Sequence, residues 1–188
     1  MVHVFEPRPI ETSALDGLLD LARRGPSAGF SQGIDFVVLD QPHTTERFWS
    51  LVDDPRFPCE PGELDAAPPV LVIATSDPGR YVERYSLPDK IDFGLDRADA
   101  WPVPFWDTDA AMACMVLLLA AVDAGLGGWF FGIGYGADAV HREFGIPDDC
   151  NIVGVVGLGY AGVDEAPRGS AYSLSRRPFD EQVHRNRW

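Results

Sequence analysis

The chain has 188 residues, of which 46% are hydrophobic and 23% are charged, and its formal net charge is −14. This length and composition predict one folded domain with a sizeable core and exclude an intrinsically disordered chain. The acidic balance argues against nucleic acids and anionic membranes as partners, because the average surface would repel both.

Cysteine usage and the N-terminal residues exclude further classes. Cys59, Cys114 and Cys150 are widely spaced and have no histidine at ligand spacing, so we expect inert thiols and neither a zinc site nor a disulfide framework. The first ten residues lack the charged and apolar regions of a signal peptide. We therefore expect a cytoplasmic protein.

The first predicted element is a helix within residues 12–25, which has apolar residues at helical spacing. Ser13 is placed to cap this helix, and Arg23 and Arg24 fall in its last turn, where cations complement the helix dipole. The Gly-Pro pair that follows ends it.

Two buried β-strands are predicted at residues 34–39 and 69–75, with a short helix at residues 44–52 between them. Residues 76–106 are rich in aromatic residues and prolines, and we expect them to form a lid with a helical turn near residues 81–85.

The most apolar stretch, residues 110–124, has about fifteen residues, fewer than the roughly twenty that span a membrane, and predicts a buried core helix. Asp107 or Thr108 is expected to cap it. Because this helix is apolar around nearly its whole circumference, we expect the sheet to cover one side and a second subunit to cover the other.

A short strand at residues 129–133, a small helix at 138–144 and a glycine-rich strand at 151–160 complete the predicted order. The chain then loses its periodicity and ends in an arginine-bearing tail whose last residue is Trp188. Tails with aromatic ends are commonly docked, so we expect this one to be docked too.

No self-contained catalytic set is present: the sequence has no GxSxG, HExxH or Walker motif, and its histidines have no partner at motif spacing. What remains is a corner of small residues at 25–29, an aromatic lid and a basic tail. This combination suggests that a bound cofactor supplies the chemistry. Ser27 and Gln32 would add hydrogen-bonding groups at the edge of a flat polar ring.

Four segments, in the right order over nearly the whole chain, resemble the FMN-dependent nitroreductase family, and we identify the chain as a member of actinobacterial type. ARRGPSAGFSQGIDFVVL resembles the segment in which a helix ends in Ala-Pro-Ser-Ala-Gly-Asn and a strand follows. DTDAAMACMVLLLAAVDAGLGGWFFGI resembles the family's central helix with its Gly-Leu-Gly and short strand. FGIPDDCNIVGVVGLGY and RRPFDEQVHRNRW resemble its final strand and its basic ending.

The resemblance implies an α+β fold, a three-layer sandwich with a central mixed, mostly antiparallel sheet flanked by helices. It implies a single domain over residues 1–188, with a lid at 76–106 and a C-terminal arm at 161–188 that reaches the partner subunit of an interlocked homodimer. FMN would lie at the subunit interface and pass hydride from NADH or NADPH to an electron-poor acceptor such as a nitroaromatic or a quinone.

The resemblance also implies a set of site residues, without a catalytic side chain or a metal because the flavin carries the chemistry. The flavin's pyrimidine edge would be contacted by Pro26, Ser27 and Ala28, with Gln32 beside them. Its other side would lie along Phe131 and Gly132, where main-chain amides would stabilise charge on the reduced ring. The phosphate would be held by Arg176 and Arg177, and the acceptor would meet Phe30, Trp101 and Phe105.

The chain departs from the family's pattern in two places. The basic N-terminal patch that holds the phosphate is missing before Phe5, and Phe30 stands where an asparagine is expected. Arg8, Arg23 and Arg24 are the candidates to compensate for the missing patch.

Two alternatives therefore stay open. One is a relative that uses a deazaflavin or catalyses a biosynthetic dehydrogenation, with Lys90 reading the ligand's charged tail. The other is a protein that binds a flavin without catalysis.

Overall fold

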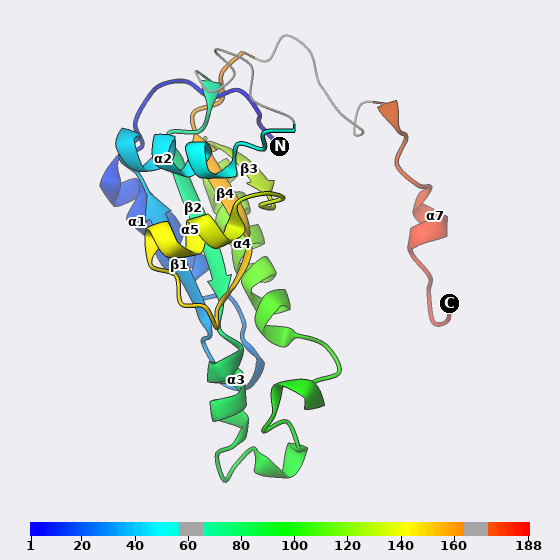
Figure 1. Ribbon diagram of the computed structural model, residues 1–188. Coiled ribbons are helices and arrows are strands. Elements are labelled where there is room, and N and C mark those ends of the chain that lie inside the picture. Colours follow the sequence, from blue (N-terminus) through cyan, green and yellow to red (C-terminus); the bar gives the residue numbers. More distant parts are fainter. Residues whose placement is uncertain (57–65, 164–172) are drawn as a thin grey trace.

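The computed structural model describes residues 1–56, 66–163 and 173–188 (Figure 1). Its strands are β1 (Ile34–Leu39), β2 (Val70–Ser76), β3 (Gly127–Phe131) and β4 (Asn151–Gly159). They form a four-stranded sheet in the order β1-β2-β4-β3. The prediction of a mixed sheet needs correction, because every strand pair among the described residues is antiparallel. The last strand in the sequence returns between β2 and β3 and runs opposite to both.

The helices of the described chain are α1 (Thr12–Ala22), α2 (Pro42–Val52), α3 (Pro78–Tyr85), α4 (Phe105–Asp123), α5 (Ala137–Phe144) and α7 (Phe179–Gln182). Each predicted helix and strand has a counterpart here. The predicted cap of α1 is wrong, since the helix begins one residue before Ser13 and has Glu11 at its N-cap. Because α1 ends at Ala22, Arg23 and Arg24 lie just beyond its last turn.

The sheet is covered on both faces, which gives the predicted three layers (Figure 1). Alternate residues of β2 point to opposite sides, as strand geometry requires. Val72 and Ala74 join one core with α1 and α4, whereas Leu71 and Ile73 join a second core with α2 and α5.

β4 is rich in glycine because side chains of neighbouring elements occupy its faces. A Cβ atom on Gly154 would lie 2.5 Å from Cζ of Phe130, and one on Gly157 would lie 2.6 Å from Cγ of Pro68. The ladder between β4 and β2 also shifts register once, as at a β-bulge.

The start of α4 differs from the prediction. The helix begins at Phe105 after an N-cap at Pro104, so neither Asp107 nor Thr108 caps it. Asp107 instead accepts hydrogen bonds from Oγ of Ser76 at 2.6 Å and from Nδ2 of Asn151 at 3.1 Å. This carboxylate therefore ties the helix to the end of β2 and the start of β4.

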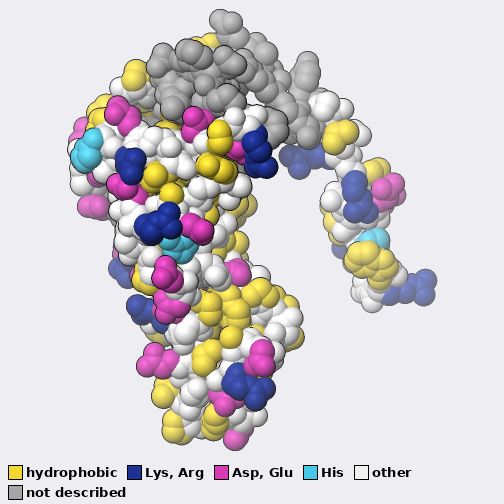
Figure 2. Space-filling model, in the orientation of Figure 1, with side chains coloured by type: hydrophobic (Ala, Val, Ile, Leu, Met, Phe, Trp, Pro, Cys, Tyr) yellow, Lys and Arg dark blue, Asp and Glu magenta, His cyan; other side chains and the backbone are white. Residues whose placement is uncertain are grey.

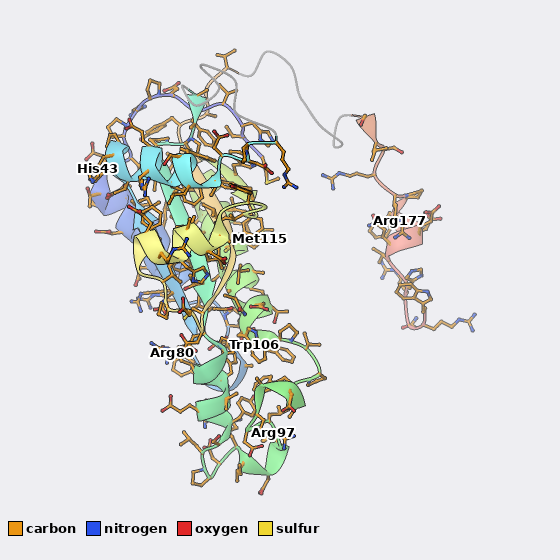
Figure 3. All side chains as sticks on the ribbon, viewed as in Figure 1. His43, Arg80, Arg97, Trp106, Met115 and Arg177 are labelled. Atoms are coloured by element: carbon orange, nitrogen blue, oxygen red, sulfur yellow. The ribbon has the colours of Figure 1, made fainter. Side chains whose placement is uncertain are left out.

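Among the described helices, only α4 has the length and hydropathy of a membrane span. It is a core helix, because its residues Ala113, Leu117 and Ala121 are fully buried and it contacts α1, β2, β3 and β4. Its opposite side is an apolar stripe, which consists of Met112, Met115, Leu119 and Val122 and is 41–67% exposed (Met115 is labelled in Figure 3). As predicted, the sheet covers only one side of this helix.

Replacing Leu117 by alanine should lower the free energy of unfolding by about 2–5 kcal/mol, because the fully buried side chain would leave a cavity between α4 and the sheet. Leu21→Ala on α1 is the matched control: its side chain is 53% exposed, and we expect a loss below about 0.5 kcal/mol. Urea denaturation of both variants measures the difference, and equal losses would contradict this assignment of the core.

Candidate functional site

The small-residue corner at 25–29 and residues 30–33, together called the corner, join the end of α1 to the start of β1. Its backbone is left-handed at Gly29, Phe30 and Gln32, with φ values of 62°, 59° and 53°. Such values are uncommon for residues other than glycine and persist only where the surroundings hold them.

The lid helix α3 supplies much of that support. A Cβ atom on Gly29 would lie 2.6 Å from Cε2 of Tyr85, and one on Gly33 would lie 2.6 Å from Cε2 of Tyr81. Nε of Arg84 donates to the carbonyl oxygen of Gly29 at 2.9 Å. The corner can therefore lie against the lid only because glycine occupies these positions.

The central helix supplies the rest of the support through Asp109, whose side chain is 2% exposed. Its Oδ2 accepts the backbone N–H of Ala28 and the hydroxyl of Tyr81, each at 2.8 Å. Burial, and next the hydrogen bond to Asp109, raise the pKa of Tyr81 well above its usual value. The hydroxyl therefore stays protonated and keeps donating.

The sequence interpretation missed Asp109. An acidic residue among apolar ones near the start of a core helix is the signal that could have found it, because a buried carboxylate requires donors nearby.

These bonds decide what the corner can offer a ligand. The N–H of Ala28 is taken by Asp109, and Pro26 has no N–H to donate. Oγ of Ser27 accepts the backbone N–H of Gln32 at 3.1 Å, which leaves the hydroxyl hydrogen able to donate outward. Of the predicted edge contacts, the Ser27 hydroxyl is thus an available polar donor, with the exposed Gln32 side chain beside it.

The aromatic residues of the lid divide into anchors and exposed rings. Trp101 is 8% exposed, its indole N–H donates to the carbonyl of Leu95 at 2.9 Å and its ring packs edge-on against Tyr81, so it holds parts of the lid together. Phe30 and Phe105, in contrast, are 75% and 38% exposed. Figure 2 shows hydrophobic side chains gathered at this end of the molecule. Lys90 belongs to the lid, and its Nζ lies 5.1 Å from the ring centre of Phe93, another lid residue.

Phe131 and Gly132 do not lie beside the corner in the same chain. The register aligns Phe131 with Val155, Ile73 and Val37, so three strand spacings of about 4.8 Å, roughly 14 Å, separate it from β1. The ring of Phe131 stacks on Trp49 of α2 at 5.4 Å. The open backbone at Gly132, where an added Cβ atom would meet nothing within 4 Å, remains able to approach a ligand.

The three arginines that were candidates to replace the missing basic patch are engaged elsewhere. Arg23 and Arg24 both pair with Asp20, and hydrogen bonds from Arg24 and then Arg23 lower the pKa of that carboxyl. The guanidinium of Arg8 lies 3.8 Å from the ring centre of Tyr160, at the end of β4.

The C-terminal arm stands apart from the body of its own chain (Figure 1). Arg176 and Arg177 are exposed on it, and Arg177, labelled in Figure 3, contacts only Glu181 of the same arm within the described residues. Trp188 is 99% exposed, so the expected docking of the tail does not occur on its own chain.

The cysteines contribute no chemistry to this region. Burial raises the pKa of Cys114 to about 11, which keeps it a neutral thiol as predicted, and burial also raises the pKa of Cys150. Cys59 lies outside the described residues. Within the described ranges, no group of three potential metal ligands is found.

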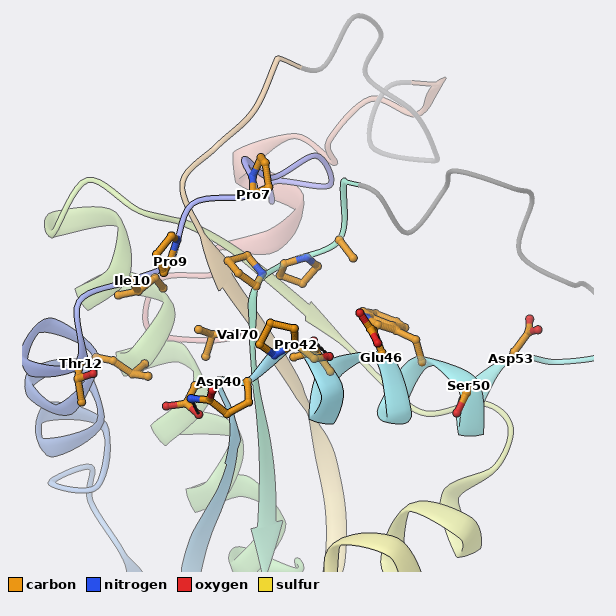
Figure 4. A pocket seen from close by; sticks show the side chains of 17 residues that line it. Pro7, Pro9, Ile10, Thr12, Asp40, Pro42, Glu46, Ser50, Asp53 and Val70 are labelled. Carbon is orange, nitrogen blue, oxygen red and sulfur yellow. Dashed lines mark hydrogen bonds between the residues drawn. The ribbon is translucent and has the colours of Figure 1, made fainter.

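A cavity of about 920 Å³ lies at the other end of the sheet (Figure 4). It is lined by prolines such as Pro42 and Pro68 and by Trp49, and also by Asp40, which follows the last residue of β1. The corner precedes the first residue of β1, so none of the predicted site residues lines this cavity.

The fit between the corner and the lid can be tested with two glycines of similar backbone conformation. Gly125→Ala, where nothing lies within 4 Å, should cost only the left-handed strain of about 1–2 kcal/mol. Gly29→Ala should cost about 1–3 kcal/mol more, because its Cβ atom would overlap Tyr85. The free energies of unfolding of the two variants give the difference, and a smaller loss for Gly29→Ala would refute the contact.

Comparisons with known proteins agree with this arrangement. A provisionally named NADH dehydrogenase/NAD(P)H nitroreductase of Archaeoglobus fulgidus is 24% identical, over all of this chain and 92% of that protein. The solved structure of a provisionally named nitroreductase of Bacillus subtilis superposes with a TM-score of 0.76 at 20% identity, over 97% of this chain and 92% of that one. An FMN-dependent nitroreductase of Clostridium difficile gives 0.66 at 19% identity, over 100% and 94% of the two chains.

These solved structures share the fold described above. The sequence model of the nitroreductase family matches residues 63–160, just over half of the chain, which include β2, the lid, α4, β3 and β4. The chain belongs to the nitroreductase family.

Proposed function

We propose that this protein is an FMN-dependent oxidoreductase that transfers hydride from NADH or NADPH through FMN to an electron-poor acceptor such as a nitroaromatic or a quinone. The observation that carries the proposal is the small-residue corner, held in a left-handed conformation against an aromatic lid, in a chain of the nitroreductase family. When bound, FMN supplies the hydride chemistry, so the protein needs to bind, orient and shield it.

The residues present fit such a cofactor. Ser27 offers its hydroxyl to the pyrimidine edge, beside Pro26, and Gly132 offers an open stretch of backbone to the other side. Arg176 and Arg177 offer the planar guanidinium groups that suit a phosphate. The exposed rings of Phe30 and Phe105 would cover the acceptor.

A second copy of the chain completes the proposed site. In one chain the corner leads into β1, whereas Phe131 lies on β3 at the opposite edge of the sheet. The arm that carries Arg176 stands apart from the body. The apolar stripe of α4 is the surface that a second copy would cover, because contiguous exposed apolar patches of this kind mark interaction sites. A homodimer in which the arms cross would bring all three parts together. The cytoplasmic location of the protein remains a prediction.

The visible spectrum of the purified protein tests the function. We expect a yellow protein, or one that becomes yellow with added FMN, and we expect NADH or NADPH to bleach it under argon. Bound flavin that neither nicotinamide reduces would favour a binding protein without catalysis. A colourless protein that takes up only a deazaflavin would overturn the proposed cofactor.

Changing Arg176 and Arg177 together to alanine should weaken FMN binding at least tenfold, because a charge-assisted phosphate contact contributes about 1.5–3 kcal/mol. The double change Arg185→Ala and Arg187→Ala removes the same charge from the end of the same arm and serves as the control. Titration of the quenching of flavin fluorescence measures both affinities. Equal affinities in the two double variants would remove the first pair from the site.

Changing Met115 and Leu119 together to glutamate should dissociate the dimer, because four carboxylates would face one another across the two copies of the stripe. Light scattering coupled to gel filtration measures the mass. Glu83→Gln on the exposed side of α3 is a control that should leave the mass unchanged. A wild-type protein that is monomeric at micromolar concentration would contradict the dimer.

A further inference from the structure

Asp109 is a carboxylate that the proposed hydride transfer does not use, although it is almost fully buried. A buried carboxylate is unfavourable unless hydrogen bonds compensate for its lost hydration. Asp109 has two such bonds, both to the same oxygen, from the N–H of Ala28 and the hydroxyl of Tyr81.

The two donors belong to parts of the molecule that are far apart in sequence. Ala28 lies in the small-residue corner, and Tyr81 lies on the lid helix α3, where its ring packs edge-on against Trp101 and Trp106. Asp109 itself belongs to the part of α4 that precedes the fully buried Ala110 and Ala113. The carboxylate is therefore a fixed point to which two parts of the proposed flavin site, the corner and the lid, are attached.

We infer that Asp109 is a positioning residue of the flavin site: its Oδ2 fixes the corner through Ala28, so that the Ser27 hydroxyl faces the ring edge, and holds the lid to the corner through Tyr81. This inference rests on the proposed function only for the identity of the ligand. The attachment of the corner is a property of the protein without ligand and can be measured separately.

Asp107 provides the matched control, because it is also an aspartate of the N-terminal part of α4 and also accepts two hydrogen bonds. Its donors, Ser76 and Asn151, belong to the sheet and not to the corner. A merely structural aspartate in this helix should lower stability when it is changed and leave flavin binding unaffected.

Hydrogen exchange of the ligand-free wild-type protein, followed by NMR, tests the attachment first. A hydrogen bond to a charged group should slow exchange of the Ala28 amide about tenfold to 100-fold relative to the neighbouring Ser27 amide. An Ala28 amide that exchanges as fast as Ser27 would overturn the inference, whether or not any variant folds.

Three variants then test the effect on the ligand, with FMN as the probe. Asp109→Leu removes both hydrogen bonds and should weaken FMN binding about tenfold or more. Asp109→Asn should restore affinity to within about threefold of the wild type, because its carbonyl oxygen can accept from both donors. Asp107→Leu should lower the melting temperature with FMN affinity within about threefold of the wild type.

The outcomes separate the inference from the proposed function. If Asp109→Leu binds FMN as the wild type does, or if Asp109→Asn loses as much affinity as Asp109→Leu, positioning through hydrogen bonds is refuted. If Asp107→Leu loses the same affinity, the effect is one of stability and the inference also fails. If the wild type binds no FMN, the proposed function fails, and the exchange of Ala28 still decides whether Asp109 fixes the corner.

Discussion

The arrangement of the elements depends on the hydrogen bonds of two carboxylates in the N-terminal part of α4, those of Asp107 and Asp109. Asp107 accepts hydrogen bonds from the ends of two strands, and Asp109 accepts them from the corner and the lid. Negative charge is favourable in the first turn of a helix, where Asp107 lies, because the unpaired backbone N–H groups point out of that end. One helix end therefore fixes the sheet, the corner and the lid relative to one another, while the rest of the helix fills the core.

The division of the candidate site follows from the antiparallel sheet. β1 and β3 are the two edge strands, so the corner that leads into β1 and the backbone that follows β3 lie at opposite edges of the sheet. No movement of side chains in one chain can close that separation. The proposed second copy would bring the two regions to one ligand, and the exposed apolar stripe of α4 and the arm that stands apart from its own body support that proposal.

Sequence patterns predicted the elements well because the length of an apolar run and the residues that end it distinguish a strand from a helix, as in β2, which is buried along its whole length, and in α4. The sequence patterns failed where a polar group could form its hydrogen bonds with any of several partners. Asp107 looked like a helix cap because its donors, Ser76 and Asn151, are distant in sequence. In the same way, the corner of small residues suggested a place for a bound cofactor, but the pattern could not show that Asp109 takes the N–H of Ala28. Arg24 was a candidate to compensate for the missing basic patch, but the sequence could not show that it pairs with Asp20.

The glycines of β4 have a consequence for the fidelity of strand pairing. Phe130 and Pro68 occupy the spaces above Gly154 and Gly157, so each of these two rings fits only where a glycine lies opposite it along the strand. A slip of β4 by one residue would drive these rings into valine or leucine side chains and turn its buried valines toward the wrong core. The absence of side chains at these positions thus selects a single alignment for a central strand that follows the other described strands in the sequence.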